Sequence, residues 1–403
     1  MRILTAAAAA LCLTSARPCA AQTPVSRDDA VRAALARSTE ALLAGSDAAL
    51  ARAQRVAAHA LPNPDLAASY SKDTPSNHLL LALPLDAPWL RGPRVAAADA
   101  AGAAAAYRYD FARAAVRFDA EAAYLRAQAA AAHARLSAHT ARDADSLLVL
   151  TRLRRDAGDA SDLDVELASV NAGELVNTAL DDSLAAVGAV LDLQALMGLS
   201  GDSVTIALTD SLARPAGAPP GATGGPDTAA TLPTLSAAAA LRSAQQTLRL
   251  ERASVLPAPT LNLGFDQSDP VEHGLLPTFG IGVEIPLFNR NRGPIAQALA
   301  DQDRADAELA AARRESAAGI ARARRERAAA LAKVDRDARL LASADRVAAL
   351  ALVAYREGAA ALPSVLEAER SARDAVGRYV DDLAAAGTAD AELRYLTTPG
   401  PTP

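Results

Sequence analysis

Cysteine, methionine and aromatic residues are scarce in this chain of 403 residues. It has two cysteines, two methionines and one tryptophan, and aromatic residues make up only 3%. Both cysteines, Cys12 and Cys19, lie near the N-terminus, so we expect neither a disulfide nor a thiolate metal site in the rest of the chain. Alanine supplies much of the hydrophobic content. Because alanine favours helices but buries little area, we expect extended helix-on-helix packing rather than a large globular core.

Basic patches and long apolar runs are also lacking. The net charge of −6 and the pI near 5.5 argue against nucleic acid as a partner. Beyond the N-terminus, no segment reaches the roughly 18 uninterrupted apolar residues that a transmembrane helix needs. If the mature chain spans a membrane, it must therefore do so as a closed β-barrel.

Motifs for catalysis or cofactor binding are missing as well. The sequence has no nucleophile elbow and no Walker motif, and the glycines of 280–282 lie in an expected strand without a phosphate loop. The closest pair of histidines, His133 and His139, has a spacing that places the two rings on different helix faces. The sequence therefore predicts no enzyme, no cofactor and no resident metal.

The N-terminus has the pattern of a cleavable secretory signal. A basic residue is followed by an apolar run over 3–13 and a small-residue ending before Gln22. We therefore predict a signal peptide over 1–21. Lipidation of Cys19 is the alternative, although the arginine and proline before it fit that pattern poorly.

The rest of the chain repeats itself about half a chain apart. The matching segments are 61–66 with 256–261, 83–85 with 285–287, 92–93 with 293–294, and Gly158 with Gly358. Such a period indicates two copies of one structural unit. We predict a first repeat over 22–200, a linker or equatorial segment over 201–232, and a second repeat over 233–403.

Each repeat predicts a β-hairpin followed by a long helical hairpin. A helix from Ser26 to about His59 comes first, because Ser26 and Asp29 give a helix-start signal. In the second repeat, apolar residues alternate with small or polar ones, as suits a strand with one face in lipid and one in water. The expected strands are 65–71, 78–85, 259–267 and 278–287, with a short one at 204–208. The expected long helices run from Pro93 to Gly158, then over 163–197, 295–355 and 362–396.

Several motifs together resemble a known family over nearly the whole mature chain. Residues 61–64 resemble its Asn-Pro entry to the first strand, and 285–293, with Pro286 and Gly293, its strand-to-helix exit. Residues 355–358, followed by 365–368, resemble its periplasmic turn. The family is the TolC-type outer-membrane efflux family, and the exit motif is most similar to its heavy-metal, CzcC/CusC-like branch.

The resemblance implies a mostly α, mixed α and β homotrimer. Three chains share one twelve-stranded outer-membrane β-barrel, which continues as an α-helical barrel through the periplasm. It implies the passive outer-membrane channel of a tripartite, RND-type efflux or export system, with a periplasmic adaptor, an inner-membrane pump and outer-membrane lipid as partners. Heavy-metal cations are the cargo suggested by the branch. A sharing of strands agrees with physical expectation, because even small membrane barrels use about eight.

A different class of function is the alternative. The chain could be a periplasmic adaptor or a structural coiled-coil protein. We would expect an adaptor to carry one helical hairpin inside small β-domains, whereas two hairpins alternate with two strand pairs in this sequence.

Charges surround the two expected turns of the helical hairpins. Gly158 and Gly358 are predicted to end the outgoing helices in a left-handed conformation that a Cβ resists. The arginines before these glycines would lie at helix C-termini and the acids after them at helix N-termini, where the helix dipole favours their charges. This structural role alone can account for them.

The family resemblance adds a second role for the same charges. In that family, acidic residues and a tyrosine form an aperture at the periplasmic tip, and Asp164, Glu367 and Tyr355 match their positions. The family's arginine after the second glycine is missing, so Arg155 or Arg356 would have to replace it in a closing lock. The sequence leaves both roles open.

The single tryptophan has two alternative roles. Trp89 follows the first expected hairpin and would sit at a membrane interface or pack at the junction with the helices. Tyr70 and Phe265 occupy equivalent positions in the two repeats and are candidates for an aromatic girdle.

Overall fold

The structure is a computed structural model that describes residues 22–73, 75–199, 201–217, 230–267 and 274–400. The predicted signal peptide, with both cysteines, lies outside these residues, as does much of the linker core. The described chain is mostly helical and forms two compact units. The sheet unit comprises Thr39–Ala115, Pro219–Arg322 and the C-terminal residues from Arg394. The tip unit comprises the chain up to Ser38, Val116–Ala218 and Ala323–Leu393.

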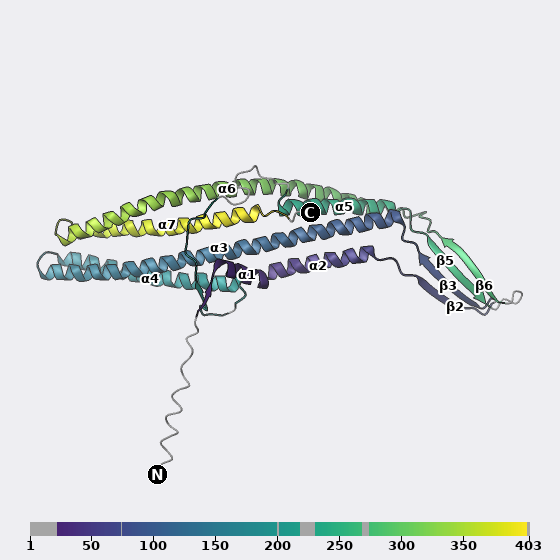
Figure 1. Cartoon of the computed structure of the whole chain (residues 1–403), viewed down its shortest axis with the longest axis horizontal. Helices are drawn as coiled ribbons and strands as arrows, with labels where there is room; N and C mark the ends of the chain where they lie inside the picture. The colour runs from purple at the N-terminus through teal and green to yellow at the C-terminus, as the bar shows by residue number, and fades with distance from the viewer. Residues whose placement is uncertain (1–21, 74, 200, 218–229, 268–273, 401–403) are drawn as a thin grey trace, which may run out of the picture. The chain divides into compact units, whose positions relative to one another are not determined.

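The sheet unit contains one antiparallel sheet of four strands (Figure 1). The strands are β2 (Asp65–Tyr70), β3 (Asn77–Pro84), β5 (Thr260–Gln267) and β6 (Leu275–Gly282), paired in that order. The two predicted hairpins are therefore present, and β3 and β5 join them. Among the described residues, no strand pairs with the outer edge of β2 or of β6.

The register of the sheet separates an apolar face from a small and polar one. Residues paired across neighbouring strands point to the same face, so each row of partners can be read from the pairing. Several members of the apolar face are strongly exposed, with Tyr70 at 73%, Phe279 at 75% and Ile281 at 74%. That face carries Leu66, Ala68, Tyr70, Leu79, Leu81, Leu83, Leu261, Leu263, Phe265, Phe279 and Ile281, with Asn77 and Gln267 at its end. The other face carries Ser69, His78, Ala82, Asn262, Gly264, Asp266, Thr278 and Gly280, with Leu80 and Leu276 as its large apolar exceptions. The alternation predicted for the second repeat is confirmed in β5 and at Phe279 and Ile281 of β6, whereas β3 carries three consecutive leucines.

The last strand differs from its predicted bounds. We expected 278–287, but β6 starts at Leu275 and ends at Gly282. Gly282 pairs with Thr260, the first residue of β5, and Pro259 immediately before it has no N–H to extend the ladder. The extra residues at the other end include Pro277, which an outer strand tolerates.

All helices of the sheet unit join the sheet at one end (Figure 1). They are α2 (Thr39–His59), α5 (Leu232–Ala253), and the first parts of α3 (Pro88–Asp156) and α6 (Arg292–Arg356). The start of α3 precedes the predicted one, so Pro93 lies inside the helix. Pro93 is the sixth residue of the helix, so its missing N–H removes one i to i−4 hydrogen bond, to the carbonyl of Trp89, near the helix start.

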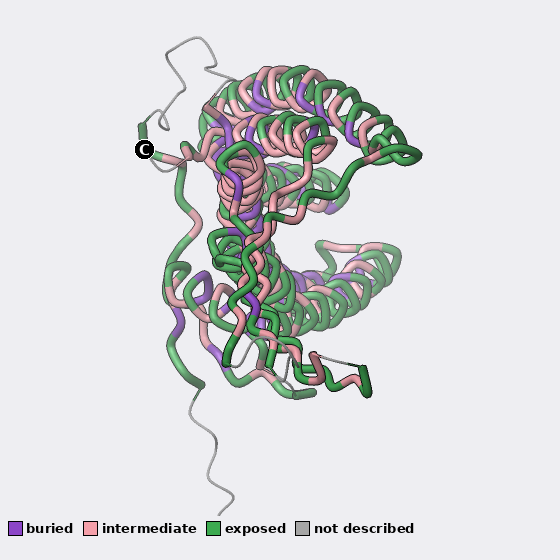
Figure 2. The backbone as a smooth tube through the Cα atoms, turned by 90° about the vertical axis from the view of Figure 1, so that its right-hand side faces the viewer, coloured by how far each residue is buried: buried purple, intermediate pink, exposed green. Residues whose placement is uncertain are grey.

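The tip unit joins two helical hairpins to a small parallel sheet. The returning helices are α4 (Asp162–Leu196) and α7 (Leu362–Leu396), as predicted within one residue. The sheet pairs β1 (Thr23–Val25) with β4 (Ile206–Leu208), which confirms the short strand expected in the linker. Buried positions occur in small groups along the helices (Figure 2), as alanine-rich packing predicts.

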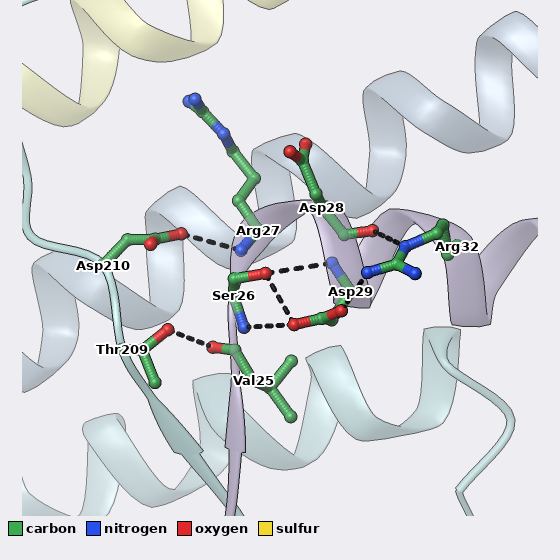
Figure 3. A network of polar contacts seen from close by, with 8 residues as sticks. All are labelled: Val25, Ser26, Arg27, Asp28, Asp29, Arg32, Thr209 and Asp210. Carbon is green, nitrogen blue, oxygen red and sulfur yellow. Dashed lines mark hydrogen bonds and ion pairs between the residues drawn. The ribbon is translucent and has the colours of Figure 1, made fainter.

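Hydrogen bonds connect the end of β1 and the residues after it with the residues that follow β4 (Figure 3). Ser26 and Asp29 form the predicted capping box of α1 (Arg27–Arg37), and the Arg27 amide donates to Asp210 Oδ2 at 2.7 Å. The buried Tyr124 hydroxyl donates to the carbonyl of Val25 at 3.0 Å and accepts from the Asp210 amide at 3.3 Å. Tyr124 thus links α3 to β1 and to the segment that follows β4.

The prediction of one helix from Ser26 to His59 is wrong, because the segment forms two helices. Ser38 has an extended backbone, with ψ of 125°, and separates α1 from α2. The end of α1 is held by Arg37, whose guanidinium donates to the carbonyl of Met197 at 3.0 Å. Tertiary contacts therefore end the helix at a serine, where the sequence has neither glycine nor proline.

Of the helices in the described residues, none combines the length and the apolar character needed to cross a membrane.

Replacing Tyr124 with phenylalanine should destabilise the tip unit. The variant leaves the Asp210 amide without its acceptor, whereas the Val25 carbonyl still accepts from the amide and the hydroxyl of Thr209, so the expected cost is about 1 kcal/mol. Thermal unfolding followed by circular dichroism would measure the loss. Tyr109→Phe is the matched control, since the described residues offer its hydroxyl no hydrogen bond and its ring contact with Arg113 survives. Equal melting temperatures for the two variants would contradict the role of Tyr124.

Candidate functional site at the helical turns

Both helical hairpins turn at a glycine in the left-handed region. Gly158 has φ of +85° and Gly358 has φ of +75°, as the sequence predicted. In the first turn, the Gly158 amide donates to Arg155 O and the Asp159 amide to Arg154 O. The Gly358 turn repeats this pattern with the carbonyls of Tyr355 and Ala354. These hydrogen bonds form a Schellman motif, which satisfies the last carbonyls of each helix.

Asp164 is bound at the start of α4. Its Oδ2 accepts from the Ser161 amide at 3.0 Å and from the Ser161 hydroxyl at 2.8 Å, while the Asp164 amide donates to Ser161 Oγ at 3.1 Å. This is a complete capping box, so the structural role predicted for the acid is present. The carboxylate also remains partly exposed.

The second hairpin starts its return helix differently. Ala361 precedes α7, so there is no side-chain cap, and Pro363 lies in the first turn, where a missing N–H is harmless. Glu367 is exposed, one turn into the helix. Its neighbours in sequence, Val365 and Ala368, are buried.

Tyr355 is a buried residue of the second turn. Its ring packs with Leu147, Ala168, Leu362 and Val365, and its hydroxyl lies 3.2 Å from Thr151 Oγ1. The side chain of Arg154 donates to the Tyr355 carbonyl, and its guanidinium lies over the tyrosine ring at 4.6 Å from the centroid. These contacts join α3 to α6 at the turns.

The arginine that contacts Tyr355 is therefore Arg154, whereas the sequence singled out Arg155 and Arg356. Arg155 binds its neighbour Asp156 at 2.6 Å and lies 3.9 Å from Asp162. Arg356 lines a cavity between helices. Nothing in the sequence distinguishes Arg154 from Arg155, because only the helix rotation at the C-terminus decides which one faces α6.

Within the described residues, no hydrogen bond or ion pair joins Asp164 to Glu367. Neither carboxylate pairs with Arg155 or Arg356 in that part of the chain. The five residues lie around the two turns, but the predicted aperture would need several copies of the chain.

A cavity of about 650 Å³ lies among α3, α6 and α7 of the tip unit. Its walls combine leucine and alanine side chains with five charged ones, namely Asp143, Asp345, Arg356, Glu369 and Arg373. Burial raises the pKa of Glu369 above its usual value; the charge of Arg373 opposes the shift and that of Asp143 adds to it. The half-buried carboxylate of Glu369 therefore lies in the partly apolar wall of this cavity.

The strand-to-helix exit is an ordered turn. Pro286 lies in the extended segment after β6, and Gly293 lies in the first turn of α6. Between them Asn291 has a positive φ of +56°, and its Nδ2 donates to the carbonyl and to the carboxylate of Glu251, each at 2.7 Å. In the junction after β3, Trp89 Nε1 donates to the Leu256 carbonyl at 3.0 Å, while the ring stays 41% exposed.

The described part of the chain holds no group of three or more histidine, cysteine, aspartate or glutamate side chains placed to bind a metal ion.

Comparison with known proteins gives a family and a fold. The outer membrane efflux protein family matches residues 231–398, from the residue before α5 to just beyond α7. No curated protein matches the chain in sequence. Residues 231–398 thus form an outer membrane efflux protein domain, in agreement with the family resemblance predicted from the sequence.

Solved structures share the fold over nearly the whole chain. One is CusC, in a study of folding and transmembrane channel formation, with 19% identity, a TM-score of 0.79, and coverage of 93% of this chain and 92% of that one. The outer membrane protein VceC from Vibrio cholerae has 19% identity, a TM-score of 0.74, and coverage of 93% and 96%. The CmeC outer membrane channel of Campylobacter jejuni has 16% identity and a TM-score of 0.78, with coverage of 92% of this chain and 85% of that one. The predicted fold class is confirmed.

Replacing Glu369 with glutamine should stabilise the protein at high pH and leave it unchanged at low pH. A raised folded-state pKa means that the folded protein holds the proton more tightly than the unfolded one. The wild-type protein therefore loses stability as the pH rises through the folded-state pKa of Glu369, whereas the glutamine variant cannot ionise and keeps it. Below the ordinary pKa near 4.5, the carboxyl is protonated in both states and the two proteins should be equally stable. Melting temperatures between pH 4 and 8 would test this, with exposed Glu367→Gln as the control. A pH-independent difference from wild type would contradict it.

Two variants separate the capping role of Asp164 from the aperture role. Ser161→Ala breaks the same capping box as Asp164→Ala but keeps the charge, so both should cost about 1 kcal/mol of stability. If Asp164 also lines an aperture, only Asp164→Ala should lower cation selectivity in single-channel recordings. Identical cation selectivity in the two variants would show that Asp164 acts only as a helix cap.

Proposed function

We propose that three copies of this chain form a passive conduit across the outer membrane and the periplasm. The observation that carries the proposal is the sheet with one exposed apolar face and one small and polar face. Such a sheet suits lipid on one side and a water-filled lumen on the other. Its two outer strands, β2 and β6, would pair between copies and close a barrel of twelve strands.

The exposed apolar stripe of α4 supports the same assembly. Leu163, Leu167, Val170, Leu180, Leu184 and Val187 follow a helical repeat, and each is at least 39% exposed. A row of this kind is typical of a helix face that packs against another helix. A second copy supplies such a helix in the proposed helical barrel.

The proposed conduit serves a tripartite, RND-type efflux or export system. The helical turns would form its periplasmic end, where Asp164 and Glu367 line the aperture and Arg155 or Arg356 adds a countercharge. The buried Tyr355 would support the aperture from behind, by holding the two hairpins together. A periplasmic adaptor and an inner-membrane pump would connect there. Heavy-metal cations are the proposed cargo, supported by the resemblance of the exit motif, residues 285–293, to the heavy-metal branch of the family. This role requires no enzymatic chemistry.

The domain limits form part of the proposal. The repeats would extend over 22–200 and 233–403, with 201–232 between them. The start of α5 at Leu232 supports the second limit. A periplasmic adaptor or coiled-coil role remains the alternative, but it gives no reason for a sheet with an exposed apolar face.

Charges placed on the α4 stripe should break the assembly. In Leu180→Asp with Leu184→Asp, two residues that are 65% and 72% exposed would bring six carboxylates into the three proposed interfaces. Wild type should migrate as a trimer on an unheated detergent gel, and the double variant as a monomer. Asp181→Asn, a neighbouring exposed position, is the control. A wild-type protein that is monomeric and soluble without detergent would refute the conduit itself.

Deleting the protein should sensitise cells to transition-metal ions. The expectation follows from the proposed cargo, and growth across a series of metal concentrations would measure it. Complementation with wild type is the positive control, and the α4 double variant should fail to complement. Unchanged metal tolerance with increased sensitivity to organic toxins would assign the conduit to another cargo.

A further inference from the structure

The two sheet-to-helix junctions, one after β3 and one after β6, differ in whether their arginines form ion pairs. After β3, Asp86 binds both basic residues of the junction. Its carboxylate lies 3.3 Å from Arg91 Nη1 and 3.0 and 3.1 Å from Arg94 Nη2, and its side chain is only 7% exposed. Both guanidinium groups of the first junction are therefore engaged in ion pairs within the chain, and the carboxylate offsets one of their two positive charges.

The second junction lacks this acid. Leu287 corresponds to Leu85 in the repeat, so Phe288 stands where Asp86 stands in the first copy. Arg292 precedes a Gly-Pro pair, as Arg91 does. Arg290 and Arg292 are both exposed, and neither has a carboxylate partner in the described part of the chain. The Phe288 side chain is 99% exposed.

The second junction is nevertheless held in place. Asn291, which lies between the two arginines, is bonded through Nδ2 to the carbonyl and the carboxylate of Glu251 near the end of α5. That contact also occupies the acidic side chain of Glu251. The phenylalanine and the two cations are thus presented on an anchored turn.

The junction continues the apolar surface of the sheet. Val283, Ile285 and Leu287 follow β6 and are 53%, 72% and 69% exposed, after Phe279 and Ile281 on the apolar face of the strand. An exposed aromatic ring beside two unpaired guanidinium groups, at the end of such a surface, matches the boundary between acyl chains and headgroups. Arginine also binds phosphate through two parallel hydrogen bonds.

We propose that residues 283–292 form a binding site for an anionic phospholipid. Arg290 and Arg292 bind the headgroup phosphate, while Phe288 and the apolar residues before it contact the acyl chains. The proposal rests on the proposed function, because that function places the apolar face of the sheet in lipid. It assigns the lipid contact to the second repeat alone, since Asp86 already binds both guanidinium groups of the first junction.

Native mass spectrometry of the full chain can test the site, with phosphatidylglycerol and phosphatidylcholine as probes. Wild type should retain phosphatidylglycerol in preference to phosphatidylcholine. Arg290→Gln and Arg292→Gln should each weaken that retention about fivefold, the effect of one cation near an anionic surface. Phe288→Asp should abolish the preference, because it recreates the carboxylate of the first junction, while Phe288→Ala should have a smaller effect. Arg304→Gln is the control, since it removes the same charge from an exposed site paired with Glu308 at 2.8 Å.

Three results would overturn the site. They are equal retention in all variants, an equal loss in Arg304→Gln, or displacement of the lipid by millimolar inorganic phosphate, which would indicate a simple anion site. Each variant is first checked for a trimer on an unheated gel. Loss of the trimer in wild type would refute the proposed function, whereas a change of lipid preference in an intact trimer tests only this site.

Discussion

The open edges of the four-stranded sheet are the constraint on which the rest of the account depends. β2 and β6 each present unpaired backbone groups, and no strand among the described residues covers them. The same sheet exposes a row of large apolar side chains on one face. In water both features carry a cost, since exposed edges and apolar patches promote association. Closure between copies within lipid removes both costs, and the proposed helical barrel follows from it.

The two repeats have the same order of elements but differ in sequence at the helical turns and at the sheet-to-helix junctions. At the turns, both hairpins keep the left-handed glycine and its hydrogen bonds. The first return helix has a capping box and the second has a proline in its first turn. At the junctions with the sheet, Asp86 binds both arginines of the first copy, whereas the second copy has Phe288 at the corresponding position. Duplication therefore supplies the scaffold, and local substitutions distinguish the two ends of each copy.

Much of the fold could be predicted from the sequence because its signals are local. Alternation revealed the strands, the positions of Gly158 and Gly358 revealed the turns, and repetition gave the two-fold plan. What the sequence missed depends on tertiary contacts. The break at Ser38, the pairing of β3 with β5 and the strand β1 are set by partners distant in sequence.

The candidate site at the turns was predicted less completely than the fold. The sequence correctly placed Asp164 at a helix start and Tyr355 near a turn, but it could not show that Arg154 contacts the tyrosine. That contact depends on the rotation of α3 at its C-terminus, which no short pattern encodes. The aperture role of the acids depends on neighbouring copies and remains a prediction.

The most direct test of the shared sheet is a disulfide between copies. Phe279→Cys on β6 would be combined with a cysteine at each position of β2, in a chain whose Cys12 and Cys19 are replaced by alanine. The account predicts that oxidation gives covalent dimers and trimers on a denaturing gel for a few neighbouring positions. Only monomers at every position, or only cross-links within one chain, would contradict it.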